Sequence, residues 1–112
     1  MDTVIDRQNR DAAPPTGERR VRAFRVTDHF ALAAWQAARA FPRPEGESLA
    51  SEIRRAVARS GGSLVAAASA PEGDPGGHRA LENAHQGLLE IRYFLYLARR
   101  LACLDLKKYK EL

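Results

Sequence analysis

The sequence predicts an all-α protein: an antiparallel up-down helical bundle with three main helices and a truncated or short fourth. Three observations support this prediction. Apolar residues recur at spacings of three and four in three long stretches, which is the periodicity of a helix with one buried face. Segments rich in proline and glycine separate the stretches. Only a short segment, residues 105–112, follows the third stretch.

The first stretch begins near Glu18 or Arg19. Residues 1–17 contain Pro14-Pro15 and Gly17, so we expect a flexible tail there and a bundle domain over residues 18–112. Pro42 ends the stretch, because proline disfavours helix in the residue before it and lacks a backbone N–H. The apolar positions of this first helix are Phe24, Phe30, Ala31, Ala34, Trp35, Ala38 and Phe41.

The second stretch starts at Ser48 or Leu49, and Gly61-Gly62 interrupts it. Each glycine inside a helix costs roughly 1 kcal/mol relative to alanine. We therefore expect either a kink at these glycines or another helix packed very close to them. The apolar face consists of Leu49, Ile53, Ala56, Val57, Ser60, Leu64, Ala67 and Ala68.

The third stretch has the most regular pattern and follows a loop at residues 70–77, in which Asp74 is the expected cap and Pro75 lies in the first turn. Its main stripe is Leu81, Ala84, Leu88, Ile91, Leu95, Ala98 and Ala102. Further apolar residues widen this stripe, so we expect the helix to be buried on two sides, against its neighbours and against another subunit. The predicted oligomer-interface residues are Leu89, Phe94, Leu97 and Leu101.

Composition limits the possible functions. A chain of 112 residues forms one domain at most. Cys103 is the single cysteine, so one chain can form no disulfide, and this favours a reducing cytoplasm. The polar beginning of the chain does not resemble a signal peptide, and we expect no membrane association.

The net charge is +4, and fifteen of the eighteen cationic residues are arginines. Such an excess of positive charge suits an anionic partner, and we expect contacts with the RNA or DNA backbone. The alternative is that the arginines lie on solvated helix faces with glutamate partners, and Arg55 or Arg59 is expected to pair with Glu90. No aromatic residues are interleaved for base stacking. The candidate phosphate contacts are Arg19, Arg20, Arg22, Arg25, Arg54, Arg55, Arg59, Arg99 and Arg100.

Candidate enzymatic or metal sites are each incomplete. His78, Glu82 and His85 share one helical face and contain half of a di-iron bundle motif, which requires a second such motif and two further carboxylates. A carboxylate and histidine metal site, completed in an oligomer, remains an alternative. We find no second acid or base for Glu90. The sequence therefore predicts no catalytic residue, no cofactor and no enzyme activity.

Several of these residues together resemble the bacterial four helix bundle protein family, also known as the 23S rRNA intervening-sequence protein family. Phe41-Pro42 resembles the end of that family's first helix. The second helix of the family carries a motif that matches Leu49, Ile53, Arg54, Arg55 and Ala56, and its third helix one that matches residues 81–84 and 88–91 with Leu95, Ala98 and Leu101. The chain departs from the family at residues 63–67, where its Asn-Ile-Ala-Glu-Gly motif is Ser-Leu-Val-Ala-Ala, and in lacking most of a fourth helix.

The resemblance implies an up-down bundle that assembles into a homo-oligomeric ring, commonly a pentamer. It also implies a scaffold or a nucleic-acid-associated accessory protein, since a related protein of diversity-generating retroelements binds nucleic acid and a reverse transcriptase. A further alternative is a small subunit whose missing fourth helix comes from a different protein.

Overall fold

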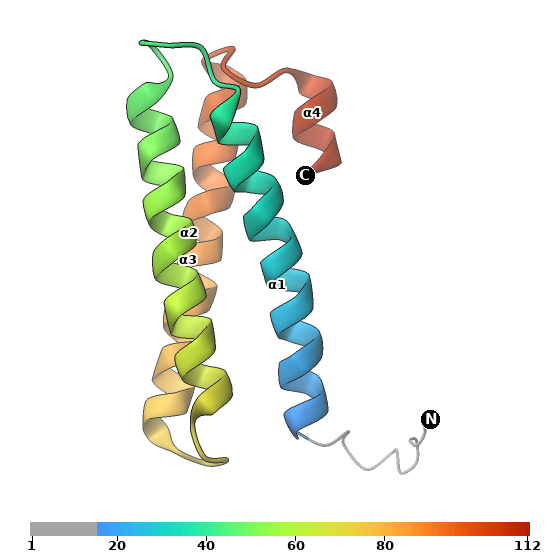
Figure 1. Ribbon diagram of the computed structural model, residues 1–112, viewed down its shortest axis with the longest axis vertical. Helices are drawn as coiled ribbons and strands as arrows, with labels where there is room; N and C mark the ends of the chain where they lie inside the picture. Colours follow the sequence, from blue (N-terminus) through green and yellow to red (C-terminus); the bar gives the residue numbers. More distant parts are fainter. Residues whose placement is uncertain (1–15) are drawn as a thin grey trace.

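The computed structural model describes residues 16–112, with side chains for residues 22 and 24–112 (Figure 1). This part of the chain is helical, without strands: α1 spans Thr16–Arg39, α2 Glu47–Ser69, α3 Pro75–Arg100 and α4 Leu106–Glu111. The prediction of an all-α chain with three long helices and a short fourth is confirmed. The predicted tail, residues 1–17, lies outside the described residues except for Thr16 and Gly17, which already belong to α1.

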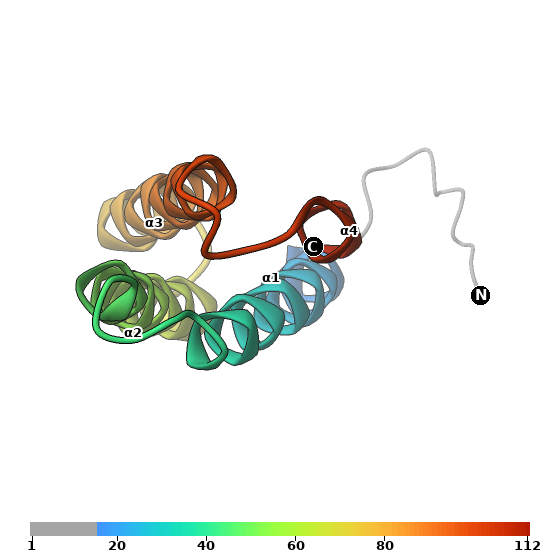
Figure 2. The same ribbon diagram turned by 90° about the horizontal axis from the view of Figure 1, so that it is seen from above.

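The three long helices form an open array in which α2 lies between α1 and α3. In Figure 1 the chain rises along α1, descends along α2 and rises again along α3. Helix α2 packs along both neighbours, whereas α1 and α3 touch each other little. Seen from above, α3, α2 and α1 occupy three corners of a square, and α4 lies at the fourth (Figure 2). None of the described helices has the combined length and apolarity of a membrane span.

The core lies where α2 and α3 meet, with α1 closing one end. Ile53 of α2 and Ile91 of α3 are fully buried at its centre. Alanines fill much of the remainder, which lets the helices approach closely. The buried cluster consists of Ala34, Ala38, Phe41, Ala50, Ile53, Ala56, Ile91, Leu95, Ala98 and Leu104.

Helices α2 and α3 approach closely at Gly87 of α3. A Cβ added there would lie 2.6 Å from the Cβ of Ser60 on α2. The expected alternative of another helix packed very close to Gly61-Gly62 is wrong, because a Cβ at either position would meet nothing within 4 Å. Helix α2 continues through both glycines, and the space that a side chain at either position would occupy is open.

Side chains cap the last two helices. Asp74 precedes Pro75 and accepts a hydrogen bond from the Gly77 N–H at 3.0 Å, so the predicted cap of the third helix is confirmed. Asp105 caps α4 by accepting from the Lys108 N–H at 2.8 Å. Tyr109 and Leu112 then pack against the core. The six residues of α4 are thus anchored at one end of the molecule.

Candidate functional site

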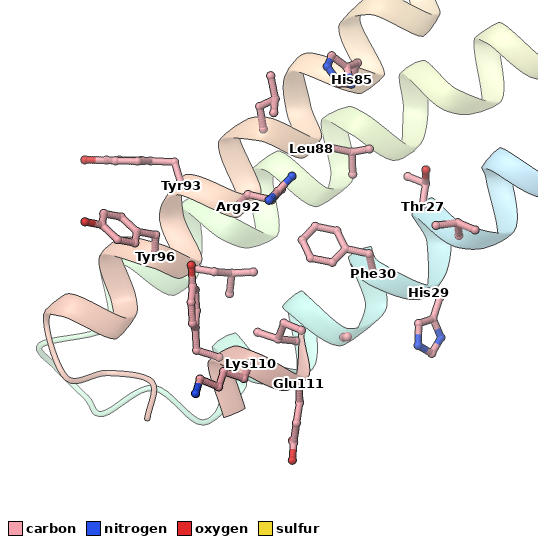
Figure 3. A pocket seen from close by; sticks show the side chains of 16 residues that line it. Thr27, His29, Phe30, His85, Leu88, Arg92, Tyr93, Tyr96, Lys110 and Glu111 are labelled. Carbon is pink, nitrogen blue, oxygen red and sulfur yellow. The ribbon is translucent and has the colours of Figure 1, made fainter. Parts of the chain in front are cut away.

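A groove of about 900 Å³ opens between α1 and α3 and is closed at one end by α4 (Figure 3). It exists because α1 diverges from α3 and the short α4 covers only part of the space between them. The lining is mostly apolar. It comprises Val26, Thr27, His29, Phe30 and Ala33 of α1, His85, Leu88, Leu89, Arg92, Tyr93, Leu95 and Tyr96 of α3, and residues 109–112.

The groove has an interior and an outer edge, which Figure 3 separates. Phe30 of α1 and Leu88 and Arg92 of α3 point into the space between the helices. The Arg92 guanidinium makes no ion pair with a described residue, so the interior is an apolar surface that carries a cation. Tyr93 and Tyr96 point away from α1, on the outer edge.

The outer edge carries a line of large side chains, Leu89, Tyr93, Tyr96 and Arg100, which we call the α3 stripe. Leu89 is 45% exposed, Tyr93 57% and Tyr96 45%. The two tyrosine rings lie 6.4 Å apart, and the Arg100 guanidinium stacks 5.8 Å from the Tyr96 ring centre. Spacings of four, three and four place these residues on one helical face. Neither tyrosine was among the predicted residues, and the prediction of no aromatic residues interleaved with basic ones is wrong here, although the same spacing rule extended from Leu89 leads to both.

The four predicted interface residues do not form one surface. Leu89 lies at the groove and on the α3 stripe. Phe94 is half-buried against the core, and Leu97 is half-buried as well. Leu101 is 61% exposed, outside the groove lining. Exposed large side chains of α3 therefore include two tyrosines, Tyr93 and Tyr96, beside the predicted Leu89.

The predicted basic cluster on α2 is neutralised by glutamates. Salt bridges join Arg54 to Glu47 and Arg55 to Glu52, each at 3.2 Å. Arg59 Nη2 lies 2.7 Å from Glu90 Oε1 on α3, which confirms the prediction of an arginine partner for Glu90. These pairs fit the alternative of solvated faces with glutamate partners better than a phosphate-binding surface.

The remaining predicted arginines lie at two separated places. Arg22 and Arg25 are exposed on the first half of α1; Arg19 and Arg20 belong to that helix, but their side chains lie outside the described set. Arg99 and Arg100 lie at the far end of α3, at the other end of the molecule in Figure 1. Within the described part of the chain, the buried Nε of Arg99 has no hydrogen-bond partner.

The predicted metal ligands do not come together within one chain. His78 Nε2 and Glu82 Oε2 lie 3.4 Å apart on the exposed surface of α3, whereas His85 lines the groove. Among the described residues, no group of three His, Cys, Asp or Glu side chains could hold a metal ion. All three residues are on α3, and the described side chains of α1 and α2 bring no further ligand to them.

No protein-family model, curated protein or solved structure matches this chain. The groove and the α3 stripe are the features from which a function can be inferred.

Proposed function

We propose that this chain is a non-enzymatic assembly protein, an antiparallel up-down bundle of the 23S rRNA intervening-sequence type. It self-associates into a homo-oligomer, a ring, and acts as a scaffold or nucleic-acid-associated accessory protein. The observation that carries the proposal is the α3 stripe, in which three neighbouring large side chains are each about half exposed on one rigid helix.

The chemistry of the stripe is that of a protein interface. Tyrosine and arginine are enriched at the centres of interfaces, because they bury a large area with few rotatable bonds and also form polar contacts. Tyr93, Tyr96 and Arg100 already contact one another before any partner is bound. This mutual support reduces the side-chain entropy that association would otherwise cost.

A second copy of the chain is the partner we propose. One contact surface is the α3 stripe, and the other includes Leu101, which is 61% exposed directly after the end of α3. A contact between two unlike surfaces repeats from copy to copy and closes into a ring when the rotation permits. A small core also gives a chain of this size a reason to associate.

The test is the mass in solution over a wide range of protein concentration, measured by sedimentation velocity. We expect an oligomer for the wild type and a monomer for Tyr93→Arg, because a buried unpaired charge opposes association. The matched control is Val65→Arg, which changes a comparably exposed residue of α2 outside the stripe and should leave the mass unchanged. A wild-type monomer at all concentrations would contradict the proposal.

The stripe also favours nucleic-acid contact as a second candidate function. Tyr93, Tyr96 and Arg100 combine a cation with exposed aromatic rings, and single strands bind such surfaces by stacking and by backbone attraction. We expect binding of a single-stranded RNA oligonucleotide that weakens with added salt. Tyr96→Leu keeps an apolar side chain but removes the stacking ring, so it should weaken RNA binding by about tenfold, the equivalent of roughly one stacked base. Equal binding by the variant would count against this function.

A further inference from the structure

Helix α4 covers only one end of the fourth corner of the bundle (Figure 2). Its six residues span about 9 Å, whereas the 24 residues of α1 span about 36 Å at 1.5 Å per residue. Tyr109 of α4 packs against the core, so this corner already holds a helix where it is filled. The groove is the part of the corner that α4 leaves uncovered.

The walls of the groove are two helical faces. Each contributes residues at spacings of four and three: Val26, Phe30 and Ala33 from α1, and Leu88, Arg92 and Leu95 from α3. Such spacings place each set on one side of its helix, and Figure 3 shows Phe30, Leu88 and Arg92 pointing into the space between the helices. A further helix lying in this space would contact both faces, as the helices of a four-helix bundle do.

The dimensions of the groove also suit a helix. Its wall on α3 runs from His85 to Tyr96, which is about 16 Å or three helical turns. A helix of this length and about 10 Å across encloses roughly 1,300 Å³, the same order as the groove volume of about 900 Å³. An extended chain or a single alkyl chain is thinner and would leave part of this width unfilled.

The charges of the groove favour an acidic occupant. Arg92 points into the interior, and no described residue forms an ion pair with it. Lys110 adds a second cation at the α4 end. Glu111 is the one acidic side chain among the described lining residues, and it points away from Arg92 in Figure 3. Covering Arg92 with an apolar helix is unfavourable unless that helix brings a carboxylate to it.

The carboxylates of α2 and α3 already have partners within their own chain. Glu47, Glu52 and Glu90 form salt bridges with arginines, and Glu82 lies 3.4 Å from His78. These two helices of a second copy therefore offer no free carboxylate to Arg92. A helix from a different protein has no such restriction.

We propose that the groove binds an acidic amphipathic helix of a different protein. The helix is about three turns long, packs its apolar face on Phe30 and Leu88, and pairs a glutamate or aspartate of its middle turn with Arg92. This helix-in-groove contact completes the fourth corner next to α4. It goes beyond the proposed self-association, which uses the α3 stripe, and Tyr93 and Tyr96 of that stripe point away from α1.

The test is the binding of labelled synthetic peptides, measured by fluorescence anisotropy. Each peptide has about fourteen residues, or about 21 Å of helix, with leucines on one face, glutamines elsewhere and one variable residue in the middle of the leucine face. We expect a central glutamate to give at least about tenfold tighter binding than a central lysine, because a like charge beside Arg92 opposes binding.

Charge reversal on α3 locates the contact. Arg92→Glu should reverse the preference, so that the lysine peptide binds more tightly. Arg92 is exposed, so the variant should keep its fold, which circular dichroism checks. The matched control is Arg79→Glu, the same change at an exposed position of α3 outside the groove lining, which should leave the preference for glutamate intact.

Two results would overturn the proposal: equal binding of the two peptides to the wild type, or no binding of either. A lower mass of Arg92→Glu in sedimentation without peptide would also overturn it, because the groove would then hold a second copy. A monomeric wild type that prefers the glutamate peptide would refute the proposed self-association alone. An oligomer without this preference would refute the helix docking alone.

Discussion

Ala102 ends α3 in a conformation that normally belongs to glycine. Its φ is 63°, in the left-handed region. This turn lets the N–H groups of Cys103 and Leu104 both donate to the Ala98 carbonyl, at 2.9 and 3.3 Å, and it directs the chain towards α4. An alanine Cβ in this conformation costs roughly 1–2 kcal/mol, whereas glycine has no such penalty.

We expect Ala102→Gly to raise the free energy of unfolding by about 0.5–1 kcal/mol, the steric gain less the extra entropy of glycine in the unfolded chain. Urea denaturation followed by circular dichroism measures this change. The control is Ala58→Gly on the exposed surface of α2, which should lower stability by about 1 kcal/mol because the position is helical. Loss of stability in both variants would show that the turn imposes no strain on Ala102.

At the scale of helices, α2 and α3 pack closely where α3 has glycines, because glycine has no side chain to keep the two helices apart. Gly87 packs on Ser60, and near the loop a Cβ on Gly77 would lie 2.7 Å from the Ala70 Cβ. Both glycines lie on the face of α3 that meets α2. Ser60 is itself buried, and its hydroxyl donates to the Val57 carbonyl at 3.3 Å, so this contact leaves no hydroxyl unsatisfied.

We expect Gly87→Ala to destabilise the protein by about 1–3 kcal/mol, because the added methyl group forces the two helices apart. Gly62→Ala provides the matched control. It makes the same change in a helix where nothing lies within 4 Å, and it should stabilise the protein by up to about 1 kcal/mol through helix propensity. Thermal unfolding of both variants gives the comparison. Similar effects in the two would mean that the contact at Ser60 is not tight.

On the scale of the whole molecule, the array is more open than a compact domain. The radius of gyration is 16.7 Å, compared with about 13 Å expected for a globular chain of this length. The molecule is elongated, with extents of 52 × 29 × 16 Å, and the divergence of α1 from α3 leaves Val26 and Leu89 exposed at the groove. Burying this exposed apolar surface against another molecule is favourable, so it promotes association.

If copies associate, thermal stability should depend on protein concentration, because binding partners stabilise the folded state by mass action. We expect the Tm of the wild type to rise over a hundredfold increase in concentration and that of Tyr93→Arg to stay constant. Differential scanning calorimetry tests this directly. A Tm independent of concentration in the wild type would argue against assembly.

Residue spacing alone determined the three long helices, the cap at Asp74 and the pairing of Glu90 with an arginine of α2. These features depend on one helical face or on helices adjacent in sequence, so they can be predicted from the periodicity of the sequence. Spacing could not show which glycine meets a neighbouring helix, since Gly62 and Gly87 differ only in what lies opposite them. It also could not show that Leu89 lines a groove and Leu101 does not. Only the tertiary structure decided that α1 diverges from α3, and this divergence creates the groove.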